Sequence, residues 1–583
     1  MRGFNYITSF LLLCSVLFVA ACDSRDEKVE IIPPVEGALL HNGKIPSITP
    51  EGAADLKKMI SEISFVDQYK EIFASIPAED RKKFEEHVDF RGKFDVIPRS
   101  DHYEVTFPDR TTITAPEDED FHSIEFHHEL TLRVRPTGDP AAFRVEFDAE
   151  PKPFYAVLKR DDETEFEFMN ITYETGEPFK ALWHNDFQIY AQMVGSMRNM
   201  KFKLTIPEEY RRDFDNIDEF GFSISNISSN AMLEPDDNNI WSGPYDSSID
   251  KVQIDLPQGV GGVTILEVKT EQMMNKLNPE AYKKFFDSYG DLMNTLYSAE
   301  LQGGGSDDGL TELLPFMKTY RDLVVDGFES TDVKVTLSDI AVRLNKTPET
   351  TYTVKDFALA EASFAGSMSG AQEDSAKIDL SYTLKGIDVG LKQFEDEFGG
   401  ETPQELVPEN FSFGFGVEKL PIKSMLDKSI AIFEEAGGNE AALEGLFMQN
   451  TPAFIDLLVK ADTQLNVNDT YVGNDVWLLL MNGAGQMNPA SPFQVSGETE
   501  VRFYGMDYLI QTLDTRMKDE ATAPSARTMI QQTLGGLGMM QMMGQQKRDE
   551  NERDYRGYTI TLTPQGAVQM NGTDMSQMMG MMQ

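Results

Sequence analysis

The chain has 583 residues, of which 40% are hydrophobic and 26% charged, a globular composition long enough for roughly two to four domains. Its 97 acidic residues outnumber 52 basic ones, and the net charge of −45 excludes nucleic acid as a partner. Two cysteines exclude a disulfide framework and a cysteine-rich zinc module.

The N-terminus has the pattern of a secretory signal. Arg2 precedes an apolar run from Ile7 to Val19, which is too short to span a bilayer as a stable helix. Small residues and Cys22 follow this run. The segment Val19-Ala20-Ala21-Cys22 resembles the lipobox of bacterial lipoproteins. The alternative is an ordinary signal peptide with a chance cysteine.

The lipobox resemblance implies cleavage between Ala21 and Cys22, with a diacylglycerol on the Cys22 thiol and an acyl chain on its amino group. Cys14 would leave with the signal, so Cys22 would be the only cysteine of the mature chain. Several acyl chains make a durable membrane anchor. We expect no other cofactor, and a position in the cell envelope facing the periplasm. Asp23 favours the inner membrane by the enteric sorting rule, with the outer membrane as the alternative.

After the signal peptide, residues 1–21, the sequence predicts an acylated polar tether over 22–48 and a short helical segment over 49–92. Thr49 is the expected N-cap of a helix that begins with Pro50, because proline is favoured at the first helical position. A second helix is expected over Ala78 to Val88.

Residues 93–270 are expected to form an antiparallel β-rich domain, because their hydrophobic period is two. Apolar residues alternate with polar ones from Ile124 to Arg135, which predicts a single strand of twelve residues. The segments 143–147 and 202–206 repeat the pattern.

A helical insertion is expected over 271–330, with two helices around a glycine-rich loop at 303–309. A second domain of strands and helices follows over 331–520, with an alternating strand at 377–385 and a β-bulge near Ser338-Asp339. Strands lead into helices at about residue 271, at about Pro421 and at about Met506.

Residues 521–583 are expected to hold a methionine-rich helix, a terminal hairpin (558–562 with 567–570) and a tail. Thioethers are soft ligands that suit Cu(I). The candidate metal ligands are Met539, Met540, Met542, Met543, Met575, Met578, Met579 and Met582. Packing or partner contact is the competing reading, because the last four fall on one face of a helix.

The histidines do not form a compact metal site if the predicted strand is correct. On one strand His122 and His128 share the apolar face, while His127 lies on the other face with Glu125 and Glu129. A cross-strand histidine such as His102 or His184 would be needed to complete a metal site. The sequence has no recognisable catalytic motif, so we expect a protein that is not an enzyme.

The expected fold is α+β, with long amphipathic antiparallel strands in one or two curved sheets and interspersed helices covering an edge or an open face. Long one-sided strands interrupted by helices, and the final strand ending Met570-Asn571-Gly572, resemble the AsmA-like and related uncharacterised periplasmic families of Gram-negative bacteria. That resemblance implies lipid movement along an apolar trough. The alternatives are a scaffolding lipoprotein that binds an envelope protein partner, and soft-metal (copper) binding through the methionine-rich end.

Overall fold

A computed structural model gives the fold. It describes residues 45–63, 94–107, 110–114, 123–127, 130–147, 153–160, 164–185, 189–208, 211–212, 217–236, 240–256, 261–301, 307–344, 355–389, 404–437, 439–491, 494–520, 522 and 524–575. The chain groups into two compact units. Unit 1 comprises residues 1–262, 266–328 and 430–443, and unit 2 comprises 263–265, 329–429 and 444–583.

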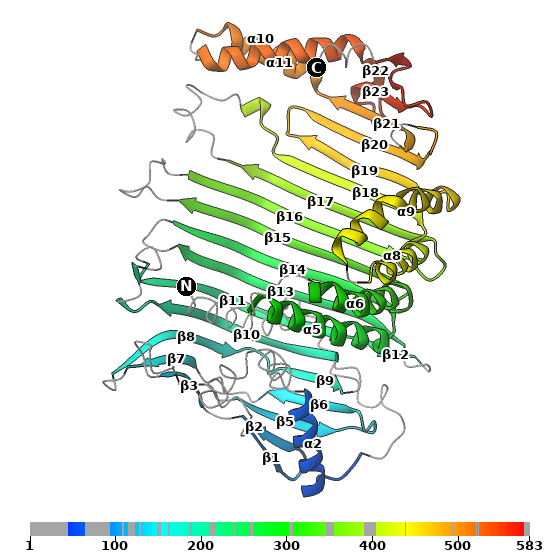
Figure 1. Cartoon of the computed structure of the whole chain (residues 1–583). Coiled ribbons are helices and arrows are strands. Elements are labelled where there is room, and N and C mark those ends of the chain that lie inside the picture. Colours follow the sequence, from blue (N-terminus) through cyan, green and yellow to red (C-terminus); the bar gives the residue numbers. More distant parts are fainter. Residues whose placement is uncertain are drawn as a thin grey trace. The chain divides into compact units, whose positions relative to one another are not determined.

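Unit 1 is built mainly from antiparallel strands (Figure 1). The strands are β1 (Asp95–Pro98), β2 (Tyr103–Thr106), β3 (Arg110–Thr114), β4 (Ser123–His127), β5 (Thr131–Pro136), β6 (Ala142–Phe147), β7 (Phe154–Lys159), β8 (Glu165–Thr175), β9 (Lys180–His184), β10 (Ile189–Thr205), β11 (Glu219–Met232), β12 (Glu234–Pro235), β13 (Trp241–Leu256) and β14 (Gly261–Leu277). The helices are α2 (Pro50–Ile63), α5 (Pro279–Leu301) and α6 (Asp307–Asp326).

The 17-residue strand β10 organises the sheet of unit 1, because one edge of it pairs with two strands in succession. Its first part pairs with β9, which continues through β6, β5 and β2 to β1. Its second part pairs with β8, which continues through β7 and β4 to β3. The register shifts between Arg198 and Lys201, where Asn199 has a φ of 51°. The other edge of β10 pairs with β11, and β11 pairs with β13.

Two of the apolar cores of unit 1 lie within these branches. One gathers buried side chains of β4, β7, β8, β10 and β11, including Phe126, Met169 and Phe202. The other packs Ala53 and Leu56 of α2 against β2 and β5. The helix start is confirmed, since Thr49 Oγ1 accepts a hydrogen bond from the Gly52 N–H at 3.0 Å.

Two boundary predictions in unit 1 are wrong. The predicted strand 124–135 is two strands, because β4 pairs with β3 and β7 whereas β5 pairs with β2 and β6. The helix expected at about 271 begins at Pro279, and β14 runs on to Leu277. Asn278 Oδ1 accepts the N–H of Glu280 at 3.1 Å, so Asn278 caps the helix and Pro279 takes the first helical position.

Unit 2 is a meander in which each strand from β15 to β21 pairs antiparallel with the next (Figure 1). Its strands are β15 (Ser330–Leu344), β16 (Lys355–Ser369), β17 (Ala376–Asp388), β18 (Asn410–Leu420), β19 (Gln464–Gly473), β20 (Leu478–Met487), β21 (Val495–Tyr504), β22 (Gln545–Arg548), β23 (Asp554–Leu562), β24 (Val568–Met570) and β25 (Thr573–Asp574). Strand β21 pairs with β23, which pairs with β22 and β24, and β24 pairs with β25.

Helices interrupt this meander at two places. A 3-10 turn, η4 (Gln404–Leu406), precedes β18; α8 (Ile422–Ala436) and α9 (Glu440–Lys460) follow β18, and both contribute residues to each unit. After β21 come α10 (Met506–Lys518) and α11 (Pro524–Met543). Buried Leu509, Leu513 and Ile530 of these two helices pack against Val501 and Phe503 of β21.

Several predictions for unit 2 are confirmed. Helices begin at Ile422 and Met506, next to the predicted positions. The terminal hairpin forms from β23 and β24. The predicted bulge near Ser338-Asp339 is wrong, because the pairs Ser338–Glu361 and Ile340–Leu359 keep one register and neither strand has an extra residue. The phase slip instead marks Asp339 itself, whose φ is 50°.

Some predicted features lie outside the described residues: the lipobox with Cys22, the helix Ala78–Val88, and Met578, Met579 and Met582. Among the helices that the structure describes, none is long and apolar enough to cross a membrane. The coarse fold prediction is confirmed, since the described chain is mostly antiparallel sheet with interspersed helices.

Candidate functional site

The candidate site is one face of the sheet in unit 2, formed by strands β15 to β18. Alternation along each strand places apolar side chains on this face, and the pairing register aligns them in rows across the four strands. We define the β15–β18 apolar face by three rows: Val333, Gly366, Leu380 and Phe415; Val335, Phe364, Tyr382 and Phe413; and Leu337, Ala362, Leu384 and Phe411.

The centre of this face is open to solvent. The exposed fractions of Leu380, Tyr382, Phe364 and Phe413 are 41%, 43%, 44% and 44%. Large apolar side chains gathered in this way indicate an interaction surface, whereas single exposed ones are ordinary.

The same face is covered farther along the sheet. Phe411 pairs with Val472 of β19, Val472 with Leu479 of β20, and Leu479 with Phe503 of β21, so these side chains share a face. There α10 and α11 pack on the sheet, and Phe503 is only 6% exposed. The exposure of the β15–β18 apolar face therefore follows from where the described helices of unit 2 pack, and not from a different sequence pattern.

The opposite face of the same four strands is polar. Lys377 and Asp379 form an ion pair at 3.1 Å, and Lys385 donates a hydrogen bond to Glu361 at 2.9 Å. A hydrogen bond of 3.1 Å joins the hydroxyls of Thr383 and Ser412. Here the sheet is amphipathic across its own thickness, with charges on one side and hydrocarbon on the other.

Gly366 shapes the exposed rows. An added Cβ at this position would lie 3.3 Å from Leu380 Cδ2 and 3.7 Å from Val333 Cγ1. The glycine therefore leaves a space beside which the Leu380 side chain packs. A larger residue here would push Leu380 farther from the sheet.

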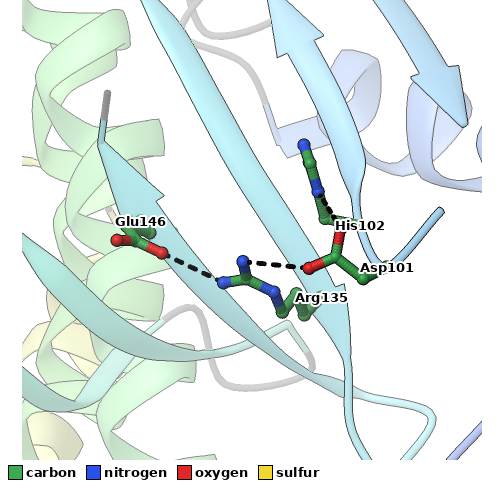
Figure 2. A network of polar contacts seen from close by, with 4 residues as sticks. All are labelled: Asp101, His102, Arg135 and Glu146. Atoms are coloured by element: carbon green, nitrogen blue, oxygen red, sulfur yellow. Dashed lines mark hydrogen bonds and ion pairs between the residues drawn. The ribbon is translucent and has the colours of Figure 1, made fainter. Parts of the chain in front are cut away.

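Polar clusters in unit 1 are the next candidates. In Figure 2, Arg135 of β5 lies between two carboxylates, with 3.0 Å to Glu146 of β6 and 3.4 Å to Asp101. His102 Nδ1 lies 2.8 Å from Asp101, and this hydrogen bond, assisted by Arg135, holds the pKa of Asp101 below its usual value. The charges in this network pair with one another, which favours a structural role.

A second cluster surrounds Glu125, whose side chain is only 9% exposed. Lys159 Nζ lies 3.0 Å away, and Arg110 and His127 each lie 3.4 Å away. Burial raises the pKa of Glu125, but Lys159 and Arg110 outweigh it and hold the pKa below its usual value. The predicted shared face of Glu125 and His127 is confirmed.

The histidines that the structure describes do not gather into a metal site. His102 contacts Asp101 and His184 lies 3.6 Å from Asp139, while His122, His128 and Glu129 lie outside the described residues. Within the described ranges, no group of three or more histidine, cysteine or acidic side chains could hold a metal ion.

The methionines of α11 divide between two environments. Met540 and Met543 pack against the core beneath the helix. Met539 and Met542 are exposed, Met542 to 83%. Met575 follows β25, beyond the helix. The described thioethers therefore do not all converge on one point.

An exposed aromatic surface on α5 and α6 of unit 1 is the last candidate. Phe286, Tyr289 and Tyr320 are exposed, and Phe285 and Phe316 lie among them with ring centroids 5.5 Å apart and ring planes tilted by 44°. Such a surface is suited to contact with another protein, because aromatic residues are enriched at interfaces.

Comparison of the chain with known protein families, with curated proteins and with solved structures finds no match. The candidate site therefore depends on geometry alone. Sequence alternation found the amphipathic strand 377–385 but did not show which stretch of its apolar face lacks a cover. Cover depends on where α10 and α11 pack, and local periodicity carries no information on that.

Proposed function

We propose that this chain is a non-enzymatic lipoprotein of the Gram-negative cell envelope, anchored through Cys22 and facing the periplasm. Its β15–β18 apolar face would hold or pass lipid or another hydrophobic ligand along a curved sheet. The observation that carries the proposal is the uncharged, half-exposed centre of that face, around Leu380 and Tyr382.

The free energy that burial of this face would contribute is consistent with ligand binding. Complete burial of a large apolar side chain contributes about 1.5–3 kcal/mol, so covering four half-exposed ones would contribute roughly 3–5 kcal/mol. That free energy corresponds to a Kd of about 1 mM. Contacts with the other side chains of the three rows would have to supply the rest of the affinity.

The predicted anchor supports the same function. Acyl chains on Cys22 would keep the protein beside a bilayer, where lipid is concentrated, and the 22–48 tether would let the folded part reach away from it. An inner-membrane position is favoured by Asp23.

Native mass spectrometry tests the proposal. A Cys22→Ser protein, exported with a cleavable signal and purified without detergent, is expected to carry extra mass that organic extraction identifies as lipid. Adding Leu380→Glu should remove that mass, because a carboxylate on the face would have to be desolvated beneath the ligand.

The matched control is Ser381→Glu, the neighbouring residue on the polar face of the same strand. It adds the same charge to β17 and should leave the bound lipid in place. A clean apo mass for the Cys22→Ser protein, or equal lipid loss in both glutamate variants, would contradict lipid binding at this face.

The second candidate function is scaffolding through an envelope protein partner. The exposed aromatic surface of Phe286, Tyr289 and Tyr320 favours it. The corresponding test is crosslinking in cells from this surface to a protein partner. This experiment takes priority if the purified protein carries no lipid.

A further inference from the structure

We propose that the β15–β18 apolar face selects its ligand by the hydrocarbon chain and is indifferent to the head group. This inference rests on the proposed function, and it names the ligand class as acyl lipids regardless of head-group chemistry. Its basis is the residue content of the three rows and the position of the charges nearest to them.

The twelve residues that define the face are all uncharged. Tyr382 carries the one hydroxyl among them, and the others offer only hydrocarbon or a glycine backbone. A phosphate or a carboxylate is selected in proteins by guanidinium or ammonium groups and by convergent N–H donors. The face presents no side chain of that kind.

The charged residues nearest to the three rows alternate to the other side of the sheet, and among them is Lys334, which lies between Val333 and Val335. Two ion pairs form on that side. Lys377 pairs with Asp379, and Lys385 pairs with Glu361. Cross-strand register places Lys385 opposite Glu361, on the row next to Ala362–Leu384 at the end of the apolar face. A head group at the apolar face would therefore meet water and not these side chains.

Among the described residues of these four strands, the three rows offer no charged group to a head group, so discrimination would come from the overall negative charge of the chain. A net charge of −45 disfavours anionic lipids at a distance. That field is screened over about 8–10 Å at physiological ionic strength and over about 3 Å near 1 M salt. A preference that arises from it must disappear in high salt, whereas a preference from direct contact would persist.

Chain length should matter instead. Each methylene that moves from water onto the face changes the affinity about fourfold. Adding one methylene to each chain of a diacyl lipid should therefore tighten binding about fourfold if one chain lies on the face, and about sixteenfold if both do.

The test uses the full-length Cys22→Ser protein and short-chain, monomeric diacyl lipids with three head groups: phosphatidylethanolamine, phosphatidylglycerol and the uncharged diacylglycerol. Each competes with a fluorescent fatty acid, in low and in high salt. We expect the three affinities to agree within about threefold in high salt, and to rise with chain length by the factor given above.

A preference of about tenfold or more that survives high salt would overturn the inference and leave lipid binding intact. Tyr382→Phe sharpens this result, because it removes the only hydroxyl and keeps the ring; unchanged affinities for all three lipids are expected. If Tyr382→Phe weakened the binding of only one of the three lipids, that result would also contradict the inference. Failure of all three lipids to bind would instead reject the proposed function itself.

Discussion

At the scale of single residues, Glu125 shows how unit 1 uses its charges. The carboxylate is nearly buried, and Lys159, Arg110 and His127 surround it. Removing one member of a buried cluster leaves the other charges without compensation. The resulting loss of folding stability therefore exceeds the net contribution of the single interaction that is removed.

Glu125→Gln is expected to lower the free energy of unfolding by about 1–3 kcal/mol at neutral pH. The folded-state pKa of Glu125 is lowered, so its stabilisation is complete above the unfolded pKa, near 4.5, and is lost as the pH falls through the folded value. Denaturant unfolding of the two proteins should therefore differ at pH 7 and converge below pH 4.5.

Glu165→Gln is the matched control, because Glu165 also pairs with Lys159, at 3.1 Å, but is mostly exposed. An exposed pair contributes about 0–1 kcal/mol, so this variant should unfold nearly like the parent. Equal losses in the two variants would show that burial of Glu125 is not the source of the effect.

At the scale of elements, α8 is attached to the hairpin between β16 and β17. Asp374 Oδ1 accepts the Ser424 N–H at 3.0 Å, and the Ser424 hydroxyl donates to the other carboxylate oxygen. Asp374 thus acts as a cap for the first turn of α8, although it lies 50 residues earlier in the chain.

Asp374→Ala should lower the free energy of unfolding by about 1 kcal/mol and speed amide hydrogen exchange in the first turn of α8. Asp374→Asn keeps an acceptor and tolerates the left-handed backbone, where φ is 54°, so its exchange should stay close to that of the parent. Hydrogen-exchange mass spectrometry measures both variants. Protection of the first turn in the alanine variant would show that this cap does not hold the helix.

The sequence predicts elements well where one face is apolar and the ends are capped by local residues. The alternation over 377–385 predicts β17, because the signal lies within a few residues. The phase slip at Ser338-Asp339 marks the left-handed backbone of Asp339, but it does not predict that the β15–β16 register continues unbroken through this position. The break between β4 and β5 could not be predicted, since the alternation continues through it and only the strand partners differ.

The candidate site was predictable in part for the same reason. Periodicity assigns Leu380 and Tyr382 to an apolar face, but their exposure depends on which stretch α10 and α11 cover. The long-range pairing that aligns Phe364, Tyr382 and Phe413 in one row also depends on register across separate strands.

At the scale of the whole molecule, acidity and an apolar face have complementary effects. A high net charge of one sign keeps protein molecules apart in solution, and this offsets the tendency of an exposed apolar face to self-associate. A lipid anchor at Cys22 would place the same molecule beside its proposed ligand. We therefore expect lipid to occupy the β15–β18 apolar face in the cell.

The most direct measurement is photocrosslinking in living cells from one position on each side of strand β17. A benzophenone-bearing residue replaces Tyr382 in one protein and Ser381 in the other, and the purified proteins are analysed for covalently attached lipid. Lipid adducts are expected from position 382 and none from position 381. Adducts in equal yield from both positions, or protein crosslinks alone from position 382, would contradict this expectation.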